Sequence, residues 1–383
     1  MSEWKKVRLG DISIDGGHYG IGAAAVEYDE SLPTYLRITD IREDGTIIRE
    51  GLKSVDDPNA CEYYLKPNDL VIARTGASTG RNYFYDGRDG QLVYAGFLIR
   101  FSIDERKIWP PYVKYWFQGS EYRTWLLNHT DGSTRANINA VTLGDCPIYC
   151  PTDASTQRKI AAVLGALDDK IENNRKICAN LEAQAQAIFK SWFVDFEPFG
   201  GKMPQGWKMG KLGDMCTIKT GKLNSCAAEG NGVFPFFTCA ERPLRINKAA
   251  YDEECVLVAG NCTPYVNYYK GKFNAYQRTY IITPMNNSLP CPILYFWMQR
   301  EIRDMVNSQQ GSVEKYFVLA DFTERDIILP EWSGLSNIVE IFCQIVNWVE
   351  NLEQESRALA AMRDALLPKL MSGEIDVEKV EVA

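Results

Sequence analysis

The residues best suited to chemistry in this sequence lie in short glycine-rich loops that follow runs of apolar residues. Arginine, lysine, asparagine, serine and threonine bond phosphate oxygens and base edges, with arginine suited to guanine and asparagine to adenine. Glycine lets backbone amides approach a phosphate closely. We therefore treat these loops as candidates for nucleic-acid binding. The plainer alternative for any single loop is a polar hairpin turn.

The candidate residues fall into two sets, one in each half of the chain. The first set comprises Arg74, Thr75, Ser78, Thr79, Arg81 and Asn82, followed later by Ser133, Thr134, Arg135 and Asn137. The second set comprises Asn261, Thr263, Tyr265, Asn267, Lys270 and Lys272, followed later by Lys315 and Tyr316. Because polar loops that carry cations recur at matched places, the pair of sets favours binding.

An internal duplication explains why these places match. The segment Trp4–Asp11 returns as Trp207–Asp214, and Pro111–Gln118 returns as Pro292–Gln299. The pair Gly132-Ser133 before Pro151 likewise returns as Gly311-Ser312 before Pro330. The offset between the copies falls along the chain, so the second copy is shorter in its middle. Three ordered matches indicate one plan used twice.

A long helix is predicted after each copy, because apolar positions recur there in steps of four and three, as in a coiled-coil seam. In the first helix these positions are Ile160, Leu164, Leu167, Ile171, Asn174, Cys178, Leu181, Ala185, Ile188 and Trp192. In the second they are Ile338, Phe342, Ile345, Val349, Leu352, Ser356, Leu359, Arg363, Leu366 and Leu370. The alternative is two long helices buried in one bundle core.

The domain order is therefore globular copy, helix, linker, globular copy, helix. We place the boundaries at residues 1–151, 152–199, 200–332 and 333–383, with a proline- and glycine-rich linker after the first helix. Each copy mixes apolar runs typical of strands, Leu70–Ala73 and Leu98–Phe101 in the first, with a short amphipathic helix around Trp116 or Trp297. This composition predicts an α+β, or mixed α/β, fold.

Catalytic motifs are missing from the sequence. No phosphate-binding G-x-x-x-x-G-K-[ST] pattern is present, and only two histidines occur. Trp109-Pro110-Pro111-Tyr112 is similar to the (Asn/Asp)-Pro-Pro-(Tyr/Phe) motif of DNA amino-methyltransferases, but tryptophan has no oxygen to hold the target amine. We expect these residues to open a helix, Gly16–Gly22 to form a flexible loop, and Asp168-Asp169 to lie on a solvated face. We expect no catalytic residue and no metal site.

Composition and net charge limit the ligands and the cellular compartment that we expect for the protein. The net charge is −8, from 42 Lys and Arg against 50 Asp and Glu, so global charge gives no support to a DNA ligand. More than half of the deficit lies in the C-terminal segment, and residues 206–330 are slightly basic. Eleven scattered cysteines, no secretory signal and no run of about 18 apolar residues predict a cytoplasmic protein without a membrane partner.

The chain resembles the specificity (S) subunit of type I restriction–modification systems. The resemblance is carried by Trp4–Asp11, Gln157–Leu164, Leu167–Ile171, Phe189–Phe193 and Leu366–Ile375. It implies target-recognition domains at residues 1–151 and 200–332, each reading one half of a split site in double-stranded DNA. It also implies that a central spacer helix at 152–199 and a C-terminal spacer helix and tail at 333–383 pair as an antiparallel coiled coil.

The resemblance further implies the partners. The spacer helices would dock methyltransferase (M) subunits, two of them, and restriction (R) subunits would join through the complex. The chain would have no catalytic activity and no cofactor, with S-adenosylmethionine bound by the methyltransferase partner. Two alternatives remain open at this point: a helical scaffold without sequence readout, and a stand-alone diverged DNA methyltransferase.

Overall fold

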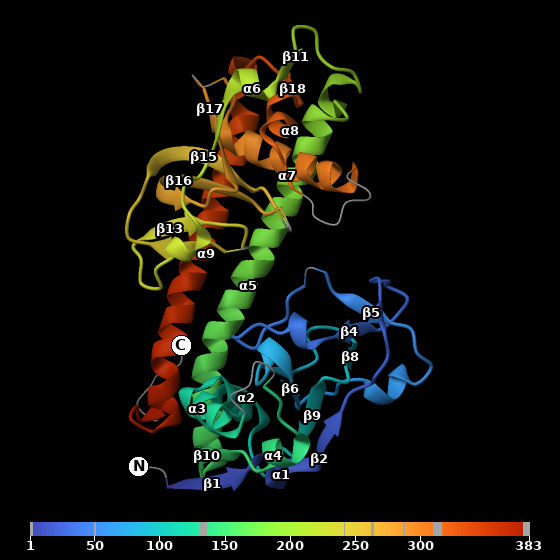
Figure 1. The fold of residues 1–383 in the computed structure, drawn as a ribbon, viewed down its shortest axis with the longest axis vertical. Helices are drawn as coiled ribbons and strands as arrows, with labels where there is room; N and C mark the ends of the chain where they lie inside the picture. The colour runs from blue at the N-terminus through green and yellow to red at the C-terminus, as the bar shows by residue number, and fades with distance from the viewer. Residues whose placement is uncertain are drawn as a thin grey trace. The chain divides into compact units, whose positions relative to one another are not determined.

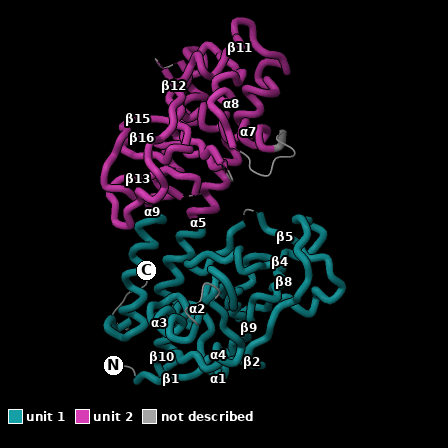
Figure 2. The backbone as a smooth tube through the Cα atoms, viewed as in Figure 1, with its two compact units in different colours: residues 1–172, 356–383 teal, residues 173–355 magenta. Residues whose placement is uncertain are grey.

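The chain divides into two compact units, each combining one globular copy with part of each long helix (Figure 2). The first unit contains residues 1–172 and 356–383, and the second contains residues 173–355. The long helices are α5 (Ala154–Phe193) and α9 (Ser336–Met371). A computed structural model describes residues 3–49, 51–130, 136–240, 242–261, 264–285, 288–308 and 316–377.

Within its described residues, the first unit is built on two four-stranded sheets and a two-stranded ribbon. The antiparallel sheet contains, in spatial order, β2 (Ser13–Tyr19), β9 (Leu98–Ile103), β6 (Asp69–Ala73) and β7 (Asn82–Tyr85). The second sheet contains β3 (Ala25–Val26), β5 (Lys53–Val55), β4 (Thr34–Leu36) and β8 (Leu92–Tyr94). The ribbon pairs β1 (Trp4–Arg8) with β10 (Pro147–Pro151). The apolar runs predicted as strands are thus β6 and β9.

Strand β6 lies at the centre of the first unit because both of its faces are buried. Leu70 and Ile72 pack in the core under the helices, whereas Val71 and Ala73 pack in a second core with strands β4 and β8. Alternation of this kind follows from the two-residue period of a strand. The helices of the unit are α1 (Leu9–Ile12), α2 (Pro110–Gln118), α3 (Ser120–His129) and α4 (Ala140–Gly144), and α2 packs against α5 (Figure 1).

The segment that is similar to a methyltransferase motif begins helix α2. Pro110 occupies the first helical position, where its missing N–H costs no hydrogen bond. The Trp109 backbone N–H donates to Gln157 Oε1 at 2.9 Å, and the buried Tyr112 hydroxyl donates to the Tyr149 carbonyl at 2.7 Å. The segment thus opens the helix, as the sequence predicts, and it also holds this helix against α5 and the β1–β10 ribbon.

The second unit repeats this plan on a single six-stranded sheet among its described residues. The strands are, in spatial order, β12 (Cys216–Thr220), β17 (Thr279–Pro284), β15 (Tyr251–Ala259), β16 (Val266–Ala275), β13 (Phe234–Phe237) and β14 (Leu244–Ile246). A ribbon pairs β11 (Lys208–Lys211) with β18 (Asp326–Leu329). The helices are α6 (Leu212–Met215), α7 (Cys291–Ser308) and α8 (Leu319–Thr323), and α7 packs against α5 (Figure 1).

One long strand accounts for part of the shortening of the second copy. In the first unit, β7 pairs with β6, and the separate strand β8 pairs in parallel with β4. In the second unit, β16 does both: its first part pairs with β15, and its end pairs in parallel with β13. The turn between β7 and β8 therefore has no counterpart.

The glycine-rich segment Gly16–Gly22 is not the flexible loop that we expected from its composition. Gly16 to Tyr19 belong to β2, which carries a bulge between Ser13 and Gly17. A Cβ atom on Gly17 would lie 2.6 Å from the Phe101 ring, and one on Gly20 would lie 2.3 Å from the Ala95 carbonyl oxygen. The glycines are needed here because other chain segments approach closely.

Helices α5 and α9 run antiparallel in both units. In the second unit, Asn174 Nδ2 donates to Glu355 Oε2 at 2.7 Å, while the Phe189 and Phe342 ring centroids lie 6.5 Å apart. In the first unit, Asp168 contacts Arg363. Residue numbers thus fall along α9 as they rise along α5. The two helices form the antiparallel pair that the resemblance implies.

Burial along the predicted seam is graded. Ile160, Leu164, Ala185, Ile338, Phe342, Ile345 and Leu370 are buried, together with the predicted polar position Asn174. The remaining predicted apolar positions are half-buried, namely Leu167, Ile171, Leu181, Ile188, Trp192, Val349, Leu352, Leu359 and Leu366. Phe189 and Phe193, each next to a predicted seam position, are more deeply buried because they enter the core with α7 and β18.

A half-buried carboxylate joins three helices in the first unit, which corrects the expectation that Asp168 lies on a solvated face. Asp168 accepts hydrogen bonds from Lys114 Nζ at 2.8 Å, the Tyr115 hydroxyl at 2.9 Å and Arg363 Nη1 at 2.9 Å. Its side chain is 16% exposed. Burial raises the pKa of Asp168, but the two cations outweigh this effect and lower it overall. Sequence alone missed this because the cations come from α2 and α9.

Another carboxylate on α5 binds α7 in the second unit. Glu182 Oε1 accepts a hydrogen bond from the Tyr295 hydroxyl at 3.1 Å, and burial raises the pKa of this carboxyl. Close by, Gln186 Nε2 donates to the Phe296 carbonyl at 3.0 Å and to Gln299 Oε1 at 2.8 Å. In both units, therefore, polar bonds fix a helix of the globular copy to α5.

We predict that Asp168→Asn lowers the free energy of unfolding by about 2 kcal/mol at pH 7, because the half-buried cations Lys114 and Arg363 lose the carboxylate that accepts their hydrogen bonds. Since the folded pKa is depressed, this contribution is present above the unfolded value of about 3.9 and is lost as pH falls through the folded pKa. Urea denaturation at several pH values measures both effects.

The adjacent exposed Asp169 offers a matched control. Its side chain is 61% exposed and forms a surface ion pair with Arg88. Asp169→Asn should change stability by no more than about 0.5 kcal/mol. Equal effects of the two substitutions would contradict the role of the half-buried network.

Candidate nucleic-acid interface

Three chain segments meet at one edge of the first unit. They are the loop after β6, the turn before β9 and the segment before α4. The Arg74 N–H donates to the Phe97 carbonyl at 3.0 Å, and the Ile138 N–H donates to the Arg74 carbonyl at 2.9 Å. Thr75 and Asn137 form an antiparallel bridge beside these bonds. The structure thus brings the loop after β6 into contact with the segment before α4, although the two lie far apart in the sequence.

The same backbone frame occurs in the second unit. The Gly260 N–H donates to the Arg278 carbonyl at 2.8 Å, and the Phe317 N–H donates to the Gly260 carbonyl at 2.9 Å. Asn261 and Tyr316 form the antiparallel bridge. Gly260 therefore corresponds to Arg74, Arg278 to Phe97, and Tyr316 to Asn137. We call these two sites the first and second loop clusters.

Arg74 is the central cation of the first loop cluster. It is half-buried, and its guanidinium carbon lies 5.0 Å from the centre of the Tyr19 ring. Its Nε atom is buried without a hydrogen-bond partner among the residues that the structure describes. Phe97 next to it is 59% exposed. The arrangement presents a guanidinium over the Tyr19 ring, which suits stacking and hydrogen bonding to a planar ligand.

Several predicted contact residues are used inside the fold. Asn82 is 8% exposed, and its Nδ2 donates to the Phe117 carbonyl at 3.0 Å. Ser78 is also 8% exposed, and the Thr79 hydroxyl donates to the carbonyls of Gly76 and Ala136. Burial leaves Ser78 and Asn82 with no surface for a ligand, so we remove them from the candidate interface. The polar residue types of this segment do not by themselves show which of its side chains are exposed to a ligand.

Arg81 is held at the margin of the first loop cluster. Its Nη1 donates to the Ile41 carbonyl at 3.2 Å, and its Nη2 lies 3.7 Å from Glu43 Oε1. The Glu43 side chain is 83% exposed. A neighbouring anion weakens the attraction of a phosphate to this cation, so Arg81 is a weaker candidate than Arg74.

The second set of predicted residues separates into two places. Asn261 and Tyr316 belong to the loop cluster, where Asn261 Oδ1 accepts a hydrogen bond from Cys239 Sγ and Tyr316 is 62% exposed. The half-buried Tyr265 and Asn267 lie where β16 begins. Lys270 and Lys272 lie further along β16, where Lys270 pairs with Glu254 at 3.2 Å.

The strand register shows how far apart these places are. Val266 pairs with Val258 near the loop cluster, whereas Lys272 pairs with Asp252. Six residues of strand correspond to about 20 Å. Lys270 and Lys272 therefore do not join Asn261 and Tyr316 in one site. Five other predicted residues lie outside the described parts of the chain: Ser133, Thr134, Arg135, Thr263 and Lys315.

Sequence reasoning missed Tyr19, Phe97 and Arg278, which flank the loop clusters. Each lies at the end or just before the start of a strand rather than in a glycine-rich loop. A usable signal is an aromatic or cationic residue directly before a buried strand, because such a position is exposed while its backbone is fixed. This signal gains weight only when the neighbouring strand ends are known.

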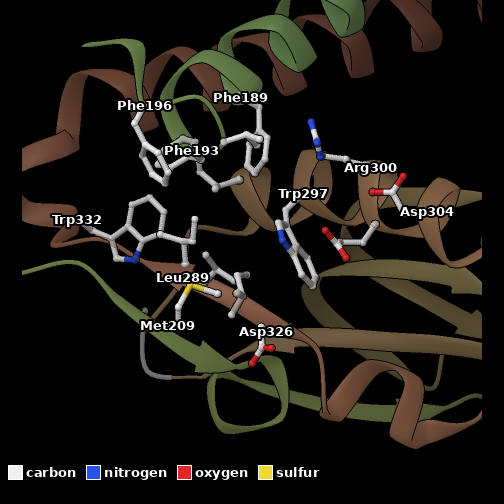
Figure 3. A pocket seen from close by; sticks show the side chains of 15 residues that line it. Phe189, Phe193, Phe196, Met209, Leu289, Trp297, Arg300, Asp304, Asp326 and Trp332 are labelled. Carbon is white, nitrogen blue, oxygen red and sulfur yellow. The ribbon is translucent and has the colours of Figure 1, made fainter. Parts of the chain in front are cut away.

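A cavity of about 280 Å³ lies in the second unit, and the aromatic side chains of Phe189, Phe193, Phe196, Trp297 and Trp332 form part of its lining (Figure 3). Ile293 is part of its lining, and the matched position in the first unit holds the larger and fully buried Tyr112. Asp326 at the margin is paired with Lys211 at 2.7 Å. We assign this space no ligand.

Two further observations concern metals and membranes. Among the described residues, no three His, Cys, Asp or Glu side chains are grouped as metal ligands would be. None of the helices in the described ranges combines the length and the apolar character that a bilayer span requires.

Two copies of one mixed α/β module, each with a polar loop cluster and joined to paired helices, define a duplicated recognition protein. The family of the type I restriction modification DNA specificity domain matches residues 1–183 and 204–360. The chain therefore belongs to this family and carries two of its modules, which confirms the resemblance to specificity subunits.

Individual relatives agree with this membership. The chain is 28% identical over 354 residues to the type I restriction enzyme MjaIX specificity subunit of Methanocaldococcus jannaschii, covering 84% of this chain and 81% of that one. It is 37% identical over 182 residues to the EcoDI specificity subunit of Escherichia coli. That alignment covers 46% of this chain and only 40% of the relative.

A solved structure shows the same fold. The S subunit of a type I restriction-modification system from M. genitalium superposes with a TM-score of 0.56 at 17% identity, over 96% of both chains. At this identity the likeness concerns the fold, which is two tandem modules with long helices.

We predict that Gly260→Ala destabilises the second unit by about 1–3 kcal/mol, because overpacking forces the surrounding backbone to shift. An added Cβ would lie 2.5 Å from the Arg278 carbonyl oxygen and 2.9 Å from the Tyr280 ring. Gly230→Ala is the control, since a Cβ there meets nothing within 4 Å. Urea denaturation should separate the two variants, and similar midpoints would contradict the close packing.

Proposed function

We propose that this protein is the DNA sequence-specificity subunit of a type I restriction–modification complex, and that each unit reads one half of a bipartite site in double-stranded DNA. One observation carries the proposal: two modules of a DNA specificity family hold exposed polar loop clusters on the same backbone frame. Residues of these clusters are of the types that bond base edges and phosphates. The two clusters carry different side chains on the same backbone hydrogen bonds, which suits the recognition of two different half-sites.

The long helices favour a site with a fixed gap. Helix α5 is continuous from Ala154 to Phe193, and both units include part of it. Separation along DNA is counted in helical turns of about 34 Å, so a stiff connection selects one spacing of half-sites. We therefore expect a motif whose two halves are separated by a constant number of unspecified bases.

The helices also offer a docking surface for methyltransferase subunits. Large apolar side chains of α5 and α9 remain exposed in the second unit: Ile177 is 38%, Ile341 is 41% and Trp348 is 56% exposed. Exposed tryptophan is the residue type most enriched at binding hot spots. We propose that methyltransferase subunits, two by analogy with the family, cover this surface, and that restriction subunits join through them.

In this proposal the chain itself is not an enzyme. The segment that is similar to a methyltransferase motif serves to start α2 and hold it in place, so it supplies no site for a target base. S-adenosylmethionine would be bound by the methyltransferase subunits. Methyl transfer by the purified chain without any other subunit would contradict this part of the proposal.

Selection from a random duplex pool tests the proposal directly. A tag on the full chain would recover it from its native cells together with its subunits, and the bound DNA would be sequenced. We expect enrichment of a motif with two defined halves and a fixed gap. Enrichment of no sequence, with or without accompanying subunits, would favour a scaffold protein instead.

We predict that Arg74→Ala weakens binding of the preferred duplex by about 1–3 kcal/mol and relaxes one half of the motif, as loss of a base contact would. Lys66→Ala is the matched control, because this exposed lysine lies just before the other end of strand β6. Titration of both variants against the selected duplex measures the effect. Equal affinities of the wild-type protein and the Arg74 variant would remove the first loop cluster from the interface.

We predict that Trp348→Asp releases the methyltransferase subunits, because it places a charge in an apolar contact. Asn347→Asp adds the same charge at a neighbouring exposed position of α9 and should leave the complex largely intact. Size-exclusion chromatography of the tagged complexes measures subunit retention. Full retention by the Trp348 variant would show that the partner binds elsewhere.

A further inference from the structure

The second loop cluster lacks the central arginine of the first. Position 74 holds an arginine whose guanidinium lies over Tyr19, whereas the matched position in the second unit is Gly260. No larger residue fits at this position, because a Cβ would lie 2.5 Å from the Arg278 carbonyl oxygen and 2.9 Å from the Tyr280 ring. The packing of the second unit therefore excludes a side chain where the first unit carries its cation.

A second arginine lies directly beside this gap. The Gly260 N–H donates to the carbonyl of Arg278 at 2.8 Å, so the two residues are bonded neighbours on adjacent strand ends. In the first unit the position that matches Arg278 holds Phe97. The two clusters thus place one arginine and one other residue on the same pair of positions, but in opposite order.

The surroundings of Arg278 suit contact with a ligand. Its side chain is exposed, and no hydrogen bond or ion pair engages it within the described parts of the chain. This distinguishes it from Lys270, which pairs with Glu254. Tyr316, which is 62% exposed, and Asn261 lie on the other side of Gly260. The cluster then contains a guanidinium, an amide and an aromatic ring, as the first cluster does.

We propose that Arg278 is a specificity-determining residue of the second unit, taking the role of Arg74 from the neighbouring strand and contacting a base edge in its half of the DNA site. The inference rests on the proposed function. Arginine suits this role because its planar fork donates two hydrogen bonds to one guanine. The hydrogen bond from the Gly260 N–H fixes the backbone of Arg278 and therefore the position of its Cα atom.

Selection from a random duplex pool, using complexes purified through the tagged full chain, tests the assignment. Arg278→Ala should lower base preference about tenfold or more at one or more positions of one half of the motif. Arg74→Ala should do the same in the other half only. Arg278→Lys keeps the charge but loses the fork, so it should relax the same positions as Arg278→Ala while retaining more overall affinity.

Lys208→Ala, which removes an exposed cation from β11 of the same unit, is the control and should leave both halves unchanged. Unchanged preferences in Arg278→Ala, uniform weakening across all sequences, or relaxation of the half that Arg74 controls would each overturn the inference. Those results would leave the proposed function standing as long as the wild-type complex enriches a bipartite motif. A wild-type complex that enriches no motif would overturn both.

Discussion

Backbone hydrogen bonds at the ends of central strands hold the two loop clusters of this protein, and the remaining features of the site depend on them. The residue that follows the central strand, Arg74 after β6 or Gly260 after β15, makes two such bonds. Its N–H donates to the turn before the neighbouring strand of the sheet, β9 or β17, and its carbonyl accepts from the segment before a short helix. Main-chain bonds do not require a particular side chain. The frame can therefore stay constant while the residues that face a ligand change.

The two units carry different side chains at matched positions of this backbone frame. One unit has an arginine at position 74, and the other has a glycine at the matched position, where the Arg278 carbonyl oxygen and the Tyr280 ring leave no space for a side chain. In the helical core, Tyr112 and Ile293 occupy matched positions, and a cavity accompanies the smaller residue. Each change is local, since the strands around it keep their register. Under the proposed function, such local changes would adapt a duplicated module to two different half-sites.

The helices follow a different rule, because their contacts depend on specific side chains. Asp168 is stabilised by cations from α2 and α9, and Asn174 bonds Glu355 across the helix pair. A half-buried carboxylate that depends on two partners costs stability if its register shifts. Polar residues in the seam thus favour one alignment of α5 with α9. Exposed apolar residues, Trp348 above all, leave part of the same helices available to a partner.

The sequence by itself determined the architecture: its repeats and heptad spacing are local patterns, and they predicted the duplication, the strands β6 and β9, and the helices α5 and α9. It also predicted candidate loops around Arg74 and Asn261, which the structure places in the two loop clusters. Only the tertiary structure decided which residues of those loops are exposed, because Asn82 is buried by a bond to α2, a segment distant in the chain. The same holds for Asp168, whose partners come from two other helices, and for Arg278, whose neighbour is set by strand pairing. Contacts between segments that are distant in the chain cannot be inferred from local residue spacing, and these contacts determine which of the polar side chains are buried.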